Sequence, residues 1–174
     1  MPFGGRSKRI PSTGRKLNFH DYIIDSDGTN WADLLAGWMD LLPPSVTVWF
    51  VNRFGDVFLV MEDGSVHLLD VGYGRIERLA DSRDDLANQI DVGDNAEGWL
   101  LVPLAAQCLA AELIHSPDQC FGFKVSPILG GEYAVDNIVP TDLSVHYSFL
   151  ADIYAQTKGL ADGTQVRVIR MEED

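Results

Sequence analysis

The strongest structural signal in the sequence is an Asp-Gly pair that separates two runs of apolar residues. Asp63-Gly64 lies between residues 57–61 and residues 65–69. This arrangement is typical of a hairpin, because the turn needs a positive φ that glycine supplies without strain. A second turn, at residues 72–74, precedes the alternating stretch 75–79, which predicts a third strand. We therefore expect an antiparallel meander.

The residues before the hairpin predict a helix followed by a strand. Apolar residues recur at helical spacing after a capping position at residues 29–30. Pro43-Pro44 would end this helix, since proline has no backbone N–H to donate. Residues 45–51 are rich in β-branched and aromatic side chains, which favours a strand. A helix packed behind the hairpin is the alternative for this stretch.

The residues after the meander have a helical pattern. Ser82 can cap a helix that reaches residue 90, and a second helical stretch covers about residues 95–113. Pro103 lies inside the second stretch and should kink it or split it in two. Because strands cluster early and helices follow, the pattern predicts an α+β fold rather than a parallel βαβ array.

The C-terminal part of the sequence predicts short extended pieces and one long helix. The extended pieces are expected at residues 120–125 and 133–139. Thr141-Asp142 then opens a helix that ends at Lys158-Gly159, and residues 166–169 form a closing strand. We expect an antiparallel β-meander with flanking helices in a single compact domain.

Charge divides the chain into two unequal parts. The 13 basic and 26 acidic residues give a net charge of −13, yet residues 1–16 carry five basic residues and no acid. The rest of the chain therefore has a net charge of −18. We expect a basic flexible tail and one domain, with a meander half and a helical half that holds the closing strand. Their bounds are 1–17 for the tail, 18–174 for the domain, and about 18–80 and 81–174 for its halves.

Length, cysteine content and hydropathy exclude several classes of protein. A chain of 174 residues suits one domain. Cys108 and Cys120 are too few for a secreted disulfide framework, and their apolar neighbours indicate reduced, buried thiols. No apolar run reaches the roughly 20 residues of a membrane span, and the start lacks the apolar stretch of a secretory signal. We expect a cytoplasmic protein that contacts no membrane.

No motif for a catalytic, nucleotide or metal site stands out. Gly72-Tyr73-Gly74 lacks the third glycine of a dinucleotide loop and does not open a helix. The four histidines are far apart in the sequence, and the two cysteines have no Cys-x-x-Cys spacing. We therefore expect no catalytic residue, no cofactor and no metal in this chain.

One stretch is unusually acidic, with a single arginine in it. It covers a predicted helix and the loop that follows. Acids of this kind often form a solvated helix face that stabilises helix N-termini. The alternative is a docking patch for a basic partner, since so acidic a domain should repel nucleic acid and attract basic surfaces. The candidate partner-binding residues are Asp81, Asp84, Asp85, Asp91, Asp94 and Glu97.

Two blocks of sequence resemble a known family. The first includes residues 52–59 and 63–66, and the second runs over residues 120–133 with its Leu-Gly-Gly-Glu-Tyr end. Together, over about residues 19–170, they are similar to bacterial immunity proteins that guard against type VI secretion DNase effectors, a family formerly of unknown function. The chain departs from the family pattern at Ser126, where Pro-Pro is expected. The wider SMI1/KNR4-like (SUKH) immunity group is a looser match.

The resemblance implies a non-catalytic protein that binds a cognate toxin with a basic, nuclease-type effector domain. An acidic protein can fill a DNA-binding cleft in place of phosphates, with charge speeding capture and a hydrophobic centre holding it. Two other classes stay open at this point. One is a general protein-interaction module of the same fold, and the other is a small-molecule hydrolase with a pocket lined by His67 or His146 near a carboxylate.

Overall fold

The computed structural model describes residues 17–113 and 116–166. The basic tail expected at residues 1–17 lies outside the described residues except for Leu17. The closing strand expected at residues 166–169 also lies outside them, apart from Val166, which is not in a strand.

A five-stranded antiparallel sheet forms the centre of the molecule, and its strand order follows the chain. The meander predicted around Asp63-Gly64 is therefore confirmed, and residues 45–51 belong to a strand rather than a helix. Gly64 has the positive φ that the hairpin requires. The strands are β1 (Ile23–Ile24), β2 (Val46–Asn52), β3 (Val57–Met61), β4 (Val66–Asp70) and β5 (Arg75–Ala80).

Strand β2 contains a β-bulge at Trp49. Val48 pairs with Leu59 and Phe50 pairs with Phe58, so Trp49 is one extra residue opposite β3. A bulge redirects side chains that strict alternation would send to opposite faces. Trp49 and Phe50 consequently pack in the same hydrophobic cluster, whereas the residues on either side of the pair pack in the other.

The helix expected after residues 29–30 is broken into two short pieces. The Asn30 side chain caps α1 (Trp31–Leu34), as predicted, but a 3₁₀ helix, η2 (Ala36–Trp38), follows at once. Packing against the last helix explains the break. The Trp38 indole donates a hydrogen bond to the backbone oxygen of Tyr147, and a Cβ on Gly37 would lie 2.7 Å from that of Ala151.

The helices after the sheet agree with the sequence pattern. Ser82 caps α2 (Arg83–Gln89) by accepting a hydrogen bond from the Asp85 backbone N–H. The next helical stretch is split at Leu101, which has a φ of 50°. Pro103 lies in the first turn after the split, where its missing N–H would have no helical partner. The two pieces are α3 (Asn95–Leu100) and α4 (Val102–Ala110).

The C-terminal region pairs β6 (Gln119–Phe123) with β7 (Ile138–Asp142) and ends in α5 (Leu143–Thr157). The extended piece expected at residues 133–139 differs, because two 3₁₀ turns, η3 (Pro127–Leu129) and η4 (Val135–Asn137), lie between the strands. The Asn137 amide holds this connection by bonding the backbone at both Val125 and Glu132. Strand β7 therefore starts later than predicted and includes Thr141-Asp142.

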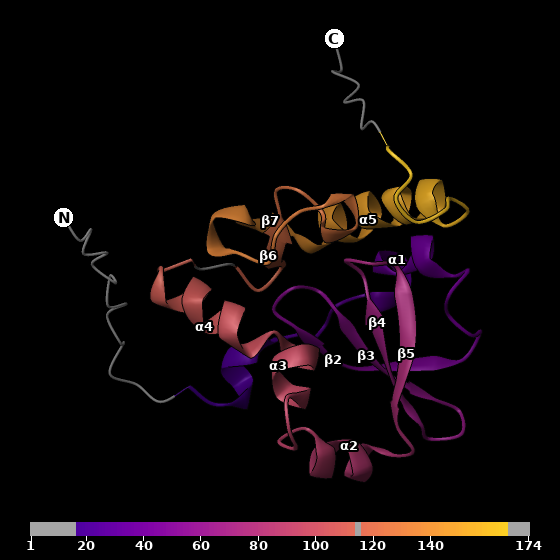
Figure 1. Cartoon of the computed structure of the whole chain (residues 1–174). Helices are drawn as coiled ribbons and strands as arrows, with labels where there is room; N and C mark the ends of the chain where they lie inside the picture. Colours follow the sequence, from indigo (N-terminus) through magenta and orange to yellow (C-terminus); the bar gives the residue numbers. More distant parts are fainter. Residues whose placement is uncertain (1–16, 114–115, 167–174) are drawn as a thin grey trace, which may run out of the picture.

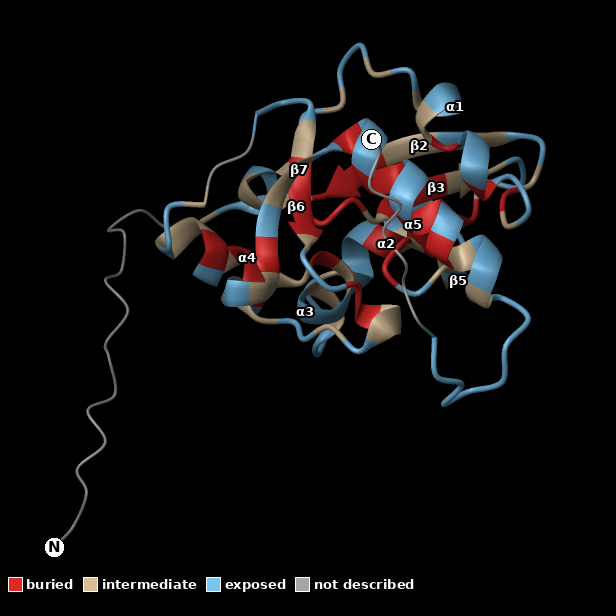
Figure 2. Ribbon diagram, turned by 90° about the horizontal axis from the view of Figure 1, so that it is seen from above, coloured by how far each residue is buried: buried red, intermediate tan, exposed pale blue. Residues whose placement is uncertain are grey.

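The helices cover both faces of the central sheet. Figure 1 shows α5 with the β6–β7 pair above the sheet, α3 and α4 beside it, and α2 below it. One hydrophobic cluster joins the sheet to α1, η2 and α5, and a second joins it to α2 and α3. In Figure 2, buried and exposed residues alternate along α5, as expected for a helix with one face on the core.

The turn between β2 and β3 connects the sheet to the surrounding elements. The Asn52 side chain is fully buried, and its oxygen accepts hydrogen bonds from the backbone N–H groups of Phe54 and Asp56. Its nitrogen donates to the Asp56 carboxylate at 2.9 Å and to the backbone oxygen of Trp99 in α3 at 3.1 Å. One amide thus shapes the turn and holds α3 in place.

The backbone of the same turn holds three further elements. The Tyr147 hydroxyl of α5 donates to the oxygen of Gly55 at 2.8 Å. The N–H of Phe121 in β6 donates to the oxygen of Arg53 at 2.7 Å. The N–H of Arg53 donates to the oxygen of Tyr22 in the 3₁₀ helix η1 (Phe19–Tyr22) at 3.1 Å.

Two groups near this turn have pKa values that are strongly shifted in opposite directions. Desolvation, and then the charge of Asp70, raise the pKa of Asp56 to about 7, against the hydrogen bonds from Asn52 and Val71. Burial lowers the pKa of His146 to about 4, against a backbone hydrogen bond at Phe54. Both side chains are therefore favoured in their neutral forms inside the folded protein.

Replacing Asn52 with alanine should lower the free energy of unfolding by about 3 kcal/mol, because it leaves several buried polar groups without partners. Urea unfolding followed by circular dichroism measures this loss. The control is Asn88→Ala on the exposed surface of α2, which should change stability by less than about 0.5 kcal/mol. Equal effects of the two substitutions would contradict a central role for the Asn52 amide.

The stability of the protein should depend on pH through two opposing slopes between about pH 4 and pH 6.5. There, unfolding lets His146 take up a proton, so its contribution to stability is lost as the pH falls. Unfolding lets Asp56 release a proton, so its contribution is lost as the pH rises. Relative to the unsubstituted protein, His146→Gln should therefore become less stable with rising pH, and Asp56→Asn more stable.

Urea unfolding at intervals of half a pH unit gives these slopes. A loss of stability that does not depend on pH shifts the whole profile of a variant without changing its slope. The difference from the unsubstituted protein should approach about 1 kcal/mol per pH unit in the middle of the window. Parallel pH profiles for all three proteins would show that neither group is held neutral by the fold.

Candidate functional site

The six acidic residues expected to form one docking patch are divided among the two sides of α2, the loop after it and the start of α3. Asp81 and Asp85 border a small polar hollow of about 330 Å³ that they share with Arg78 and Gln89. The Arg78 guanidinium donates a hydrogen bond to the Asp81 carboxylate at 2.8 Å. This exposed ion pair adds little stability, but it offsets part of the negative charge on that side.

The other side of α2 adjoins an apolar groove. Asp84 and Ala87 are three residues apart in α2, a spacing that places side chains on one side of a helix, and Asp91 lies two residues beyond its end. Ala87 and Asp91 line a groove of about 820 Å³ together with residues from η1, β2 and α3. Asp91 therefore puts negative charge at the apolar surface, and Asp84 lies on the same side of α2 as Ala87.

The groove is built from segments that are far apart in the sequence. Phe19 and Tyr22 come from η1, Trp49 and Phe50 from the bulge of β2, and Ile90 from the end of α2. Aromatic rings form one wall, with Phe19 against Phe50 at 5.3 Å and Trp49 against Phe50 at 5.1 Å between ring centroids. The wall is open to solvent, because Phe19 keeps 41% of its surface exposed.

Asp94 and Glu97 extend the acidic surface along the start of α3. Asp94 precedes the helix without a capping hydrogen bond from its side chain, and Glu97 lies in the first turn. Both are exposed. Within residues 17–113 and 116–166, no cation lies at ion-pair distance from Asp84, Asp91, Asp94 or Glu97.

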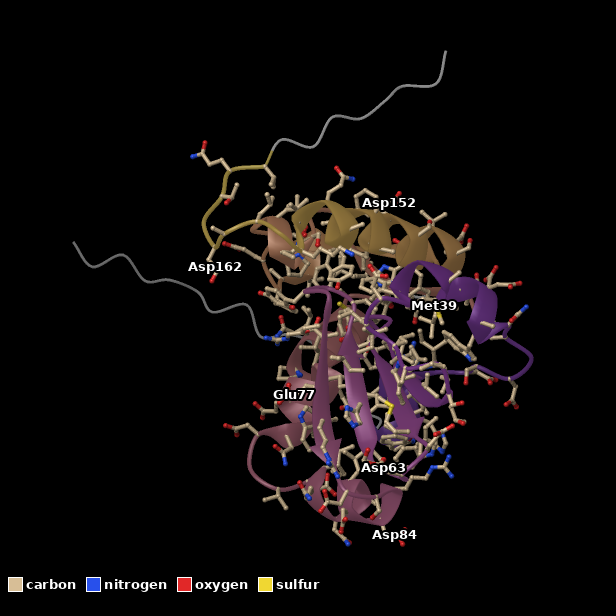
Figure 3. All side chains as sticks on the ribbon, turned by 90° about the vertical axis from the view of Figure 1, so that its right-hand side faces the viewer. Met39, Asp63, Glu77, Asp84, Asp152 and Asp162 are labelled. Atoms are coloured by element: carbon tan, nitrogen blue, oxygen red, sulfur yellow. The ribbon has the colours of Figure 1, made fainter. Side chains whose placement is uncertain are left out.

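Negative charge by itself does not single out this face of the molecule. Figure 3 shows Asp63 and Asp84 at one end, Asp152 on α5 at the opposite end, and Glu77 on β5 between them. What distinguishes the α2 side is an exposed apolar groove beside carboxylates such as Asp91, which has no ion-pair partner within the described part of the chain. Val92, in the loop between α2 and α3, also keeps 59% of its surface exposed. Exposed apolar patches mark interaction sites on soluble proteins.

The apolar half of this surface was not predicted from the sequence. Trp49 and Phe50 stand next to each other in a strand, where alternation sends neighbours to opposite faces, and only the bulge brings them together. Phe19 gives no periodic signal, since it lies in a short 3₁₀ turn. A β-branched strand with two adjacent aromatic residues was the one available hint.

A second, polar pocket lies where β4 and β5 meet α3. It has a volume of about 320 Å³ and is lined by Asp56, Asp70, Arg75 and Tyr133, among others. Arg75 donates a hydrogen bond to Asp70 at 3.0 Å, while Asp56 accepts from Asn52 and from the backbone of Val71. The carboxylates are thus engaged in holding the turns around them.

The two histidines named for the hydrolase alternative lie outside both the groove and the polar pocket. His146 keeps 4% of its surface exposed, and a Cβ on Gly55 would lie 2.7 Å from its Nε2 atom. His67 lies 3.1 Å from the Ser65 hydroxyl, which donates its proton to Asp63 instead. A serine nucleophile requires the base to accept the hydroxyl proton, and this arrangement does not provide that.

The two thiols lie in the interior of the protein. Cys108 and Cys120 are buried and free, as expected from their neighbours. Burial raises the pKa of Cys108 to about 11 and that of Cys120 further, which is opposite to the shift that activates a nucleophile. Among the described residues, no three side chains of His, Cys, Asp or Glu converge on a metal position.

No described helix has the length and hydropathy needed to cross a membrane.

Comparison with known families places the α2 side within a matched region. A family model described as "T6SS immunity protein Tdi1, C-terminal" matches residues 80–154. The match runs from the end of β5 into α5, so it includes all six acidic residues but leaves out most of the meander. No curated protein matches the chain closely enough to count as a relative. Over residues 80–154 the chain is therefore similar to type VI secretion immunity proteins, and the resemblance seen in its sequence is confirmed for that span.

Proposed function

We propose that this chain neutralises a cognate type VI secretion effector of the nuclease type by binding it, without catalysing a reaction of its own. The observation that carries the proposal is the match of residues 80–154 to an immunity protein family. The nuclease character of the effector is supported by charge. A nuclease presents basic side chains to phosphates, and this chain has a net charge of −18 outside residues 1–16.

The proposed mechanism is occupation of the effector's DNA-binding surface. Carboxylates along α2 and α3 substitute for the phosphates of the substrate and steer the two proteins together. The proposed contact residues are the six acids at positions 81–97, of which Asp91 lines the apolar groove and Asp94 and Glu97 lie at the start of α3. Asp81 contributes less, because Arg78 offsets its charge.

Co-expression of the chain with the effector gene expected to lie beside its own gene tests the proposal. We expect a stable complex on size-exclusion chromatography and loss of DNase activity at one equivalent of the chain. The association rate should fall as the salt concentration rises, since steering between opposite charges is screened. A pair of purified proteins that neither associate nor affect DNA cleavage would contradict the proposed function.

The acidic surface is tested by a matched pair of double substitutions. Asp91→Asn with Asp94→Asn should slow association with the effector by about tenfold at low salt. Asp152→Asn with Asp162→Asn changes net charge equally, but on the exposed surface of α5 and beyond it. The control should slow association by less than about twofold. Stopped-flow kinetics measures both, and equal effects would show that only net charge matters.

A further inference from the structure

We propose that the groove between η1, β2, α2 and α3 binds a segment of the effector that combines a bulky apolar side chain with basic residues. This inference rests on the proposed function and names the chemistry of the contact. It requires an apolar floor, negative charge at the edge and a reason to favour one occupant over others. The described residues supply the floor and the charge and argue against a second copy, and the experiment separates the effector from residues 1–16.

The floor of the groove is apolar and large enough to take side chains from a partner. Its volume of about 820 Å³ is within the range of sites that enclose a ligand group. Phe50 and Leu86 form its buried base, while Phe19 and Trp49 stay partly open to solvent. Aromatic and aliphatic surfaces of this kind are where interfaces gain most of their affinity.

The edge of the groove favours a cation. Asp91 lines it from just beyond the end of α2, and Asp84 lies seven residues earlier, on the side of α2 that carries Ala87. The guanidinium of Arg83 lies 5.4 Å from the centre of the Trp49 ring. The chain's own guanidinium thus already lies against Trp49, as cation–π attraction favours, and a cation of the partner is attracted by Asp91 instead. A segment with lysine or arginine next to its apolar side chain therefore complements both parts.

Two other occupants of the groove have to be considered. A second copy of the chain fits it less well, and residues 1–16 must be distinguished from the effector by experiment. A second copy of this chain would bring a second set of carboxylates against the first, and like charges repel. Residues 1–16 carry five basic residues and join the described structure at Leu17, which itself lines the groove. They are the other basic segment within reach, so the test must distinguish them from the effector.

Substitution of Ala87 tests the groove without disturbing the core. Ala87 is exposed on α2 and lines the groove, so Ala87→Arg fills it and adds a repelling charge. Asn88→Arg adds the same side chain one residue further along the same helix, at an exposed position that does not line the groove. Circular dichroism melting should show that both variants stay folded.

Calorimetric titration with the purified effector domain gives the expected outcome. Ala87→Arg should weaken binding by about thirtyfold or more, and Asn88→Arg by less than about threefold. If both variants weaken binding equally and only slightly, while the unsubstituted chain still binds and inhibits the effector, this inference is overturned and the proposed function stands. Absence of binding by the unsubstituted chain would overturn both.

A fluorescent label identifies the occupant. Ala87→Cys can be labelled selectively, because Cys108 and Cys120 are buried with raised pKa values. The emission should shift to the blue when the effector domain is added, and Asn88→Cys should respond less. A shifted emission in the free chain that reverts when residues 1–16 are deleted would assign the groove to that segment instead. A shift that grows with chain concentration would assign it to a second copy, and either result overturns the inference.

Discussion

The hydrogen bonds of the β2–β3 turn are the constraint on which the rest of the structure depends. The Asn52 amide satisfies the turn internally and bonds α3, while the adjoining backbone bonds η1, β6 and α5. Buried polar groups are costly unless all are paired. The turn therefore fixes the relative positions of the elements that supply the groove as well as those that cover the opposite face of the sheet.

The surface beside α2 combines two interactions with different physical reach. Charge acts over about a Debye length and decides how quickly partners meet. Apolar contact acts only at van der Waals distance and decides how long the two partners stay together. Carboxylates occur at both ends of the molecule, as Asp84 and Asp152 show. In the proposed function, the groove beside α2 is the part of the surface that retains the partner.

The sequence predicts the parts of this fold that local chemistry controls. The Asp63-Gly64 turn, the Ser82 cap and the interruption near Pro103 each follow from the residues themselves, and all are present in the structure. The short α1 does not follow from its periodicity, because Trp38 and Gly37 are drawn into contacts with α5. Tertiary packing there outweighs the helical pattern.

The candidate surface is predictable only in part, for the same reason. Acidic residues close together in sequence can be seen at once, but their division between two sides of α2 depends on the neighbours that the fold supplies. The groove forms only where η1, β2 and α3 pack together, and a local sequence pattern does not indicate contacts between segments that are far apart in the chain. The Tdi1 family match likewise starts after most of the meander, so it does not include Phe19 or Trp49.

The extra residue in β2 also limits how this protein can change during evolution. Because Trp49 has no partner position on β3, residues before and after it follow opposite phases of inward and outward alternation. Loss of a single codon here would restore regular pairing and leave one aromatic ring in the groove where Trp49 and Phe50 now lie together. Point substitutions can vary the lining of the groove, whereas a one-residue deletion would remove its shape, so strand length here should be inherited unchanged among relatives that recognise a partner in the same way.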